Sequence, residues 1–351
     1  MSTSPTYENT GAPTRHDTGK KPPHDTAQHA PHDTGKLTYH ERLQTLSEAS
    51  VHIHFDAFTD IDWDHPDFAI DPTDPRWVLP DADPLGAHPW YKRQPLEVRT
   101  RIGLWRYANI VKVGMQFENV LIRGVMDYLF ALRNQNPEFR YLTHEVTEEC
   151  HHTQMFQEFV NRSGADVPGG RRSFRVVSRF LPLAGSLLPE SFFTGVLAGE
   201  EPIDHVQKAI LRGGADIHPL MRRLMQIHIA EEARHISFAH EFLRQKVPGY
   251  GKARKGALSV AFPVIMRVLG DVIVVPDRRT AAKIGVPHWV IKDIFWKSPD
   301  GQKLLRDLFS DVRMLAEEIG LMNRTSRRVW RMLRIDGRPS RYRGEPAPRN
   351  A

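Results

Sequence analysis

The chain has 351 residues, about 40% of them hydrophobic, which is enough for one large domain or two small ones with a sizeable core. Much of its +6 net charge lies in the C-terminal run RRVWRMLRIDGRPSRYRG, which is typical of a solvated face or tail, and no basic-plus-aromatic pattern points to nucleic acid. The single cysteine, Cys150, excludes an intrachain disulfide, and we expect neither a signal peptide nor a membrane span. These features predict a cytoplasmic protein.

The first part of the chain is predicted to lack a core of its own. Residues 1–36 contain HDTGK, HDTAQ and HDTGK, repeated every eight residues and separated by Lys, Pro and Ala. Such polar, Pro-rich composition predicts a disordered low-complexity tail, with a His/Asp metal-binding tract as the alternative. Residues 37–97 mix short apolar pieces with many Pro and Asp, and we expect an extended wrapping segment with little regular structure.

Helical periodicity dominates from residue 97 onward. Apolar residues recur at spacings of three and four, with Gly or Pro at the ends, over about 97–133, 138–162, 173–187, 189–213 and 219–246. A short strand-like VIVVP at 272–276 and a helix at about 299–320 follow. Long helices joined by modest loops predict an all-α fold: a helical bundle over 98–335 with N- and C-terminal additions, ending in a basic flexible tail at 336–351.

Two of these helices carry the same motif, acid-acid-x-x-His, as EECHH at 148–152 and EEARH at 231–235. Glu149 and His152 are three residues apart and share a helix face, as do Glu232 and His235. His228 lies four residues before Glu232, so three metal-competent groups form one stripe about 60° wide. One E-x-x-H alone is typical of a surface ion pair. Two copies on two long helices favour a di-metal carboxylate bundle, which takes one further Glu from each of two other helices.

The two further glutamates can be sought on the preceding helices. Glu118 is the only acid between Leu104 and Met126, and its neighbours are largely apolar. In FFTGVLAGEEPIDHVQ both Glu200 and Glu201 are available, and we favour Glu200 because it continues an apolar stripe. A buried acid is costly unless it is paired or metal-bound, which a pair of divalent cations would offset.

The resulting set of oxygen and nitrogen donors, without thiolate, suits iron or manganese better than structural zinc. The neighbouring Glu148 and Glu231 either orient the ligand imidazoles or are exposed, and the sequence leaves both readings open. His151 is one residue off the stripe, and Cys150 is expected to be a small buried apolar residue, so neither is predicted as a ligand.

Glu118, the E-E-x-x-H at 148–152, Glu200 and the H-x-x-x-E-x-x-H at 228–235 resemble the non-haem di-iron arylamine N-oxygenases, the p-aminobenzoate N-oxygenase family of the ferritin-like di-iron superfamily. His228 is the specific part, because ordinary ferritin-like oxidases have two histidines. The string LAGEEPID also looks like the family's third-helix ligand segment. The resemblance covers roughly 100–245.

The resemblance implies a ferritin-like bundle, usually dimeric, that uses O2 as co-substrate at two irons to oxidise an amine nitrogen to hydroxylamine, nitroso and nitro. The implied partners are a small-molecule substrate and an external electron donor, because no flavin or nicotinamide fingerprint is evident. The implied metal ligands are Glu118, Glu149, His152, Glu200, His228, Glu232 and His235.

The chain departs from this family ahead of Glu118, where Ile110 and Val113 replace a substrate-facing Tyr and Arg, with Lys112 out of register. This departure leaves open both the anchor for an aromatic carboxylate and p-aminobenzoate as the substrate. Alternatives are a radical-generating subunit, which Phe156 in place of a Tyr disfavours, a di-iron hydroxylase or desaturase acting on a C–H bond, and a non-enzymatic iron-binding bundle.

Overall fold

The computed structural model describes residues 37–214 and 216–338, so the repeat-containing tail and most of the basic C-terminal tail lie outside the described residues. Within these ranges every regular element is helical and none is a strand. The predicted all-α class is therefore confirmed.

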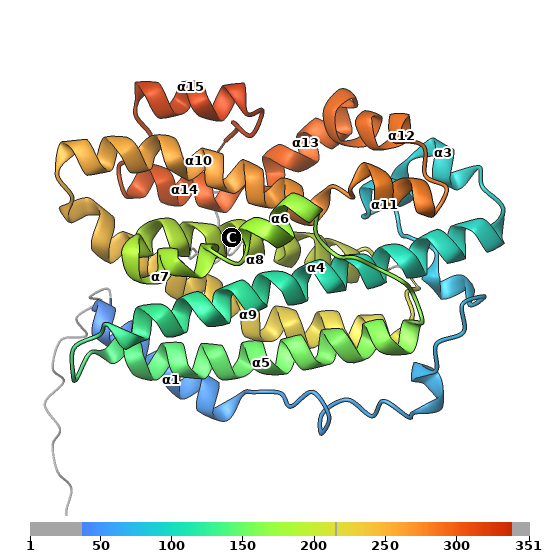
Figure 1. The fold of residues 1–351 in the computed structure, drawn as a ribbon, viewed down its shortest axis with the longest axis horizontal. Helices are drawn as coiled ribbons and strands as arrows, with labels where there is room; N and C mark the ends of the chain where they lie inside the picture. The colour runs from blue at the N-terminus through green and yellow to red at the C-terminus, as the bar shows by residue number, and fades with distance from the viewer. Residues whose placement is uncertain (1–36, 215, 339–351) are drawn as a thin grey trace, which may run out of the picture. The chain divides into compact units, whose positions relative to one another are not determined.

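Four long helices form the bundle: α4 (Leu96–Phe130), α5 (Pro137–Ser163), α8 (Pro189–Arg212) and α9 (Pro219–Lys246). Short loops join α4 to α5 and α8 to α9, so each pair is an antiparallel hairpin, and the two hairpins pack together through α4 with α8 and α5 with α9 (Figure 1). This is the arrangement in which four helices can each present one stripe to a shared interior.

Local signals explain where these helices begin and end. Asn136 caps α5 by accepting a hydrogen bond from the backbone N–H of Glu138, and Pro137 occupies the first turn. The helix ends at Gly164, whose left-handed φ of 62° terminates it without a Cβ penalty. His218 and Pro219 begin α9 in the same way.

Further helices cover the bundle. α1 (Tyr39–His52) packs against α5 and α9, and α10 (Lys252–Val274) lies along α8, with α15 (Arg324–Met332) on its other side (Figure 1). Shorter elements complete the fold: η1 (Pro66–Phe68), η2 (Pro75–Trp77), α2 (Pro84–Ala87), α3 (Pro89–Lys92), η4 (Val247–Gly249), α11 (Arg278–Lys283), α12 (His288–Lys292) and η5 (Asp293–Lys297).

Four local expectations were wrong. The segment 37–97 contains the helix α1, because Thr38 and Glu41 form a capping box. The helix expected at 173–187 is broken into α6 (Arg172–Val177), η3 (Leu181–Leu183) and α7 (Ala184–Leu187), and that at 299–320 into α13 (Pro299–Leu308) and α14 (Ser310–Glu318). The VIVVP run lies in the last turns of α10 and beyond, because packing overrides the strand propensity of its β-branched residues.

One helical stretch, Lys252–Lys283, is the single one in the described ranges that is long and apolar enough to cross a membrane by length and composition. In this fold 56% of its most apolar window is buried. A core helix passes the same test, so the stretch does not show a membrane span.

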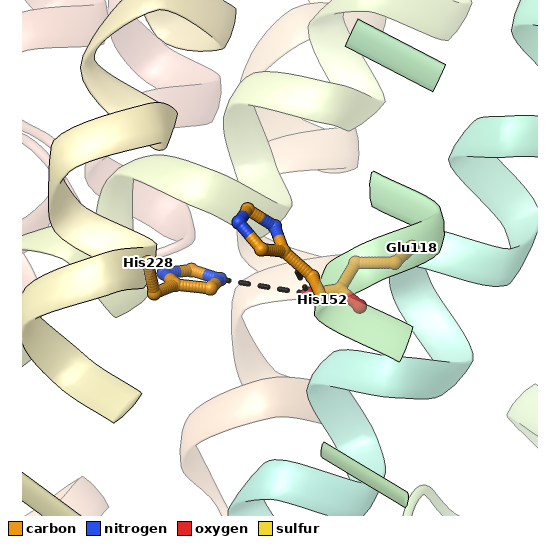
Figure 2. Close-up of side chains that lie close together, drawn as sticks. All are labelled: Glu118, His152 and His228. Atoms are coloured by element: carbon orange, nitrogen blue, oxygen red, sulfur yellow. Dashed lines mark ion pairs between the residues drawn. The ribbon is translucent and has the colours of Figure 1, made fainter. Parts of the chain in front are cut away.

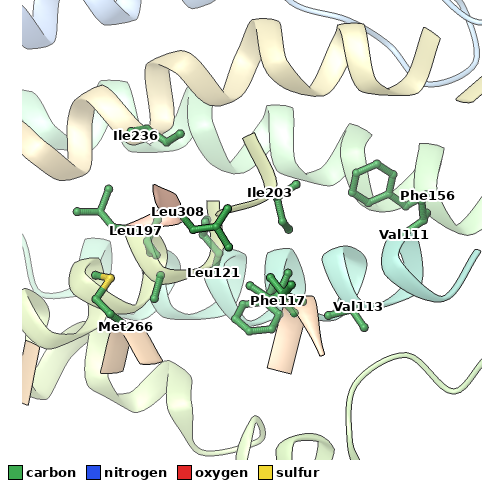
Figure 3. Close-up of a cluster of buried hydrophobic side chains, with 14 of the residues drawn as sticks. Val111, Val113, Phe117, Leu121, Phe156, Leu197, Ile203, Ile236, Met266 and Leu308 are labelled. Atoms are coloured by element: carbon green, nitrogen blue, oxygen red, sulfur yellow. The ribbon is translucent and has the colours of Figure 1, made fainter. Parts of the chain in front are cut away.

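The bundle interior is apolar on both sides of a polar layer. Phe193, Phe238 and Phe242 pack together with Tyr128, and the Phe193 and Phe242 ring centroids are 4.4 Å apart. Figure 3 shows Phe117 and Leu121 of α4 in the same interior, with Leu197 and Ile203 of α8. The charged groups of the bundle are thus held between closely packed apolar side chains.

Candidate metal centre

The structure brings all seven predicted ligands into one buried layer, with none more than 3% exposed. Each of the four bundle helices contributes to it. They are Glu118 on α4, Glu149 and His152 on α5, Glu200 on α8, and His228, Glu232 and His235 on α9.

One end of the layer is formed by three helices. Glu118 Oε1 lies 3.5 Å from His228 Nε2 and 4.0 Å from His152 Nδ1, and the three side chains converge as Figure 2 shows. The Nδ1 of His228 donates to Gln207 Oε1 at 3.1 Å, which leaves its Nε2 lone pair directed at the carboxylate. Burial lowers the pKa of His228 to about 4, so this imidazole is neutral near pH 7 and able to bind a metal ion.

The two motif glutamates lie between the histidines. Glu149 places Oε2 3.5 Å from His152 Nδ1 and Oε1 3.0 Å from His235 Nδ1. Glu232 does the same, with Oε1 3.4 Å from His152 Nδ1 and Oε2 3.2 Å from His235 Nδ1. Each carboxylate therefore has one oxygen toward each imidazole, so Glu149 and Glu232 would help to hold metal ions together with His152 and His235.

The fourth helix contributes Glu200 rather than Glu201. Ligand atoms of Glu200, His228 and Glu232 lie within 4.8 Å of one another. Glu201 instead makes a short hydrogen bond with His240 Nε2, outside this group. The geometry favours Glu200 as the member of the ligand set.

Glu148 and Glu231, left open by the sequence, are both buried and are paired across the two motifs. His152 Nε2 donates to Glu231 Oε2, and His235 Nε2 donates to Glu148 Oε2, both at 2.8 Å. Each carboxylate thus fixes the imidazole of the opposite motif with Nδ1 facing the centre. Arg234 supports the pair, with Nη2 2.9 Å from Glu148 Oε1.

The remaining polar atoms fit a pair of divalent cations. Among the described residues, both carboxylate oxygens of Glu118, Glu149 and Glu232 and the Nδ1 atoms of His152 and His235 are buried without a hydrogen-bond partner. Buried polar groups are normally hydrogen-bonded, so these unpartnered atoms destabilise the folded protein unless bound metal ions pair with them. Burial and neighbouring carboxylates raise the pKa of Glu118 and Glu200 well above 4.5. Two divalent cations would balance the four ligand carboxylates.

Side chains that were not predicted as ligands lie outside this layer. His151 is half-buried and its Nδ1 lies 3.6 Å from Asp56, and Cys150 is also half-buried, where a buried side chain was expected. Phe156 covers the centre from one side, with its ring 5.3 Å from that of His228.

Glu145 was missed by the sequence analysis. It is fully buried on α5, one turn before Glu149, and neither of its oxygens has a hydrogen-bond partner among the described residues. Burial raises its pKa to about 8. The i, i+4 spacing from Glu149 was the available signal, because it places Glu145 on the ligand stripe.

Comparison with known proteins identifies the family of this chain. The model of the family described as P-aminobenzoate N-oxygenase AurF matches residues 36–320. The chain belongs to this family. It is a ferritin-like di-iron oxygenase family, which confirms the predicted resemblance and fold.

Its relatives extend over nearly the whole chain. The chain is 54% identical over 308 residues to Uncharacterized protein Rv0885 of Mycobacterium tuberculosis and to Uncharacterized protein Mb0909 of Mycobacterium bovis. Each match covers 88% of this chain and 91% of the relative. The names of these relatives state no reaction.

Proposed function

We propose that this chain is an O2-dependent non-haem di-iron oxygenase that oxidises an amine nitrogen of a small molecule. The observation that carries the proposal is the buried layer of four carboxylates and three imidazoles. Five of these side chains, those of Glu118, Glu149, His152, Glu232 and His235, have buried ligand atoms without a hydrogen-bond partner among the described residues. Membership of an oxygenase family supports the proposal. Oxygen and nitrogen donors without thiolate suit iron, or manganese as the alternative.

The first oxidation is balanced as amine plus O2, two electrons and two protons giving hydroxylamine plus water. Bound iron supplies redox chemistry toward O2, and the electrons come from an external donor, which we propose to be a reductase or small reductant. The chain's own side chains hold the centre in shape. Glu148 and Glu231 keep the two imidazoles oriented, and the packed hydrophobic core encloses the centre on the sides away from the cavity.

The metal assignment is tested by elemental analysis of protein expressed with iron. We expect two iron ions per chain. Glu232→Ala should lose most of the bound metal while circular dichroism shows unchanged helical content, because Glu232 approaches both His152 and His235. Glu158→Gln, on α5 but outside the centre, is the matched control and should keep its iron. Full metal content in Glu232→Ala would contradict the assignment.

The reaction is tested by single-turnover oxidation. Reduced, iron-loaded protein is mixed with O2 and an arylamine panel, and products are measured by mass spectrometry with 18O2. One labelled oxygen on nitrogen supports the proposal.

We also propose that the protein is a cytoplasmic homodimer. Analytical ultracentrifugation measures the oligomeric state directly. A monomer would contradict the proposed dimer and leave the proposed reaction untouched.

A C–H hydroxylase or desaturase is the second candidate. It is favoured by a cavity beside Glu200 that is lined almost entirely by apolar side chains, since such a cavity also suits hydrocarbon. The same labelling experiment separates the two, because hydroxylation places the label on carbon and desaturation leaves none in the product. Tight iron binding without turnover of either substrate class would indicate an iron-binding bundle.

A further inference from the structure

A cavity of about 330 Å³ adjoins the candidate metal centre. It lies between α4, the α6–η3–α7 segment, α8 and α10, and Glu200 is part of its wall. Ligand atoms of Glu200 lie within 4.8 Å of those of His228 and Glu232, so the cavity reaches the centre itself. Its volume is within the range of about 300–1,000 Å³ that is usual for small-molecule sites.

The cavity opens to solvent along α10. Val264 and Val268 line it and are 40% and 54% exposed. A ligand could therefore enter past α10 and reach Glu200 at the inner end.

The lining is apolar almost throughout. Among the lining residues, all of them described, Glu200 has the only ionisable side chain, and Ser191 has the only other polar one. No Lys, Arg or His faces the space, so a carboxylate or phosphate would be buried there without a counter-charge and beside an acidic group. Burial of an unpaired charge is strongly unfavourable.

The wall also has an aromatic side. The rings of Phe117 and Phe174 are stacked, with centroids 4.8 Å apart and planes at 14°, and Phe192 also lines the cavity. Figure 3 shows Phe117 beside Leu121 on α4, and both line the cavity. Such a wall favours a planar ring. An arylamine nitrogen is uncharged at neutral pH, so it can approach Glu200 without bringing a buried ammonium.

We infer that this cavity is the substrate site and that it takes an uncharged, lipophilic arylamine without an acidic substituent, its nitrogen toward Glu200 and its hydrocarbon end toward Val264 and Val268. This inference rests on the proposed function for the reaction, but the binding specificity stands on the cavity alone. It separates this chain from a p-aminobenzoate oxygenase, because the anionic end of that substrate has no partner here.

The test is a binding titration on the iron-loaded protein at pH 7 with the neutral fluorescent probe N-phenyl-1-naphthylamine. Methyl 4-aminobenzoate and 4-aminobenzoate are then compared as competitors, since they share the arylamine and differ in that a methyl ester replaces the charged carboxylate. The ester should displace the probe at a concentration at least tenfold lower than the acid. Equal displacement by both, or no probe binding, would overturn the inference.

Variants locate the site. Gly195 lines the cavity and an added Cβ there would meet only Leu269 Cδ1, at 3.4 Å, so Gly195→Leu should fill the space and weaken probe binding at least tenfold. Gly256→Leu is the control, because nothing lies within 4 Å of a Cβ at that exposed position. Val264→Trp blocks the opening from a solvent-exposed position, and serves if Gly195→Leu does not fold. Unchanged binding in the folded variants would place the probe elsewhere and refute the assignment.

A gain of binding is also expected. Val268→Arg puts a guanidinium at the opening and should improve competition by 4-aminobenzoate severalfold without improving the ester. The same titration on Glu232→Ala protein shows whether selective probe binding persists without the metal. In the wild-type protein, selective probe binding with no iron or turnover would leave the cavity assignment standing and the oxygenase proposal refuted, whereas iron and turnover with unselective binding would do the reverse.

Discussion

Replacement of Glu145 by glutamine should stabilise the metal-free protein at neutral pH. Glu145 is fully buried, and its two oxygens have no hydrogen-bond partner among the described residues. Burial, together with the nearby carboxylates of Glu149 and Glu232, raises its pKa from 4.5 to about 8. Glutamine has nearly the same shape and carries no charge, so the substitution removes the titration without opening a cavity.

The sign and size follow from linkage. Between pH 4.5 and about 8 the folded state keeps the proton on Glu145 while the unfolded state has lost it, so the wild-type protein loses stability as pH rises through this window. Each pKa unit corresponds to about 1.4 kcal/mol. The free energy of unfolding of the glutamine variant should therefore exceed that of the wild type by at most about 3 kcal/mol at pH 7. The advantage should vanish near pH 4.5 and level off above pH 8.

Urea unfolding of chelator-treated protein at several pH values measures this difference. Glu158→Gln is the control on the same helix, because Glu158 is partly exposed and paired with Arg162. This substitution should change the free energy of unfolding by no more than about 0.5 kcal/mol. A glutamine variant whose advantage over wild type is the same at pH 5 and pH 8 would show that Glu145 is not held protonated by burial, and the reasoning would be refuted.

Two further substitutions test the centre and the packing around it. Glu231→Gln should weaken iron affinity about 10–100-fold in a chelator-competition titration, because the carboxylate that orients a ligand imidazole is lost, while Glu158→Gln should leave it unchanged. Gly103→Ala should lower stability by about 1–3 kcal/mol in thermal unfolding, because its Cβ would lie 1.8 Å from the Trp77 carbonyl oxygen. Gly256→Ala, with open space around it, should raise stability by about 0.5–1 kcal/mol; a gain at Gly103 would contradict the packing.

The four bundle helices were predictable because their signals are local. Apolar spacing, Pro at the first turn and Gly after the last turn all act within one helix, and the predicted bounds agree with α4, α5, α8 and α9 to within a few residues. The shared face of Glu149 and His152 follows from the same geometry. Helix α1 also had a local signal in Thr38 and Glu41, but the Pro- and Asp-rich sequence after it obscured the pattern.

The pairing of Glu148 and Glu231 could not be predicted, because it depends on how α5 and α9 face each other. Within its own helix each of these residues precedes a ligand and lies off the ligand stripe, which suits an exposed side chain equally well. Only when the two helices pack does each carboxylate reach the imidazole of the opposite motif. The symmetry of the two motifs thus creates a crossed pair that neither copy contains.

The substrate side of the centre is still less visible in the sequence than the metal side. Metal ligands obey a fixed spacing along one helix, since two groups must reach the same ion. The cavity wall instead combines residues from Phe117 to Leu269, contributed by α4, α8, α10 and the broken α6–α7 segment, and no spacing rule connects them. Gly195 shows the consequence, because its role is the absence of a side chain. The di-iron oxygenase family could therefore be recognised from motifs, whereas the proposed substrate class is argued from the packed structure.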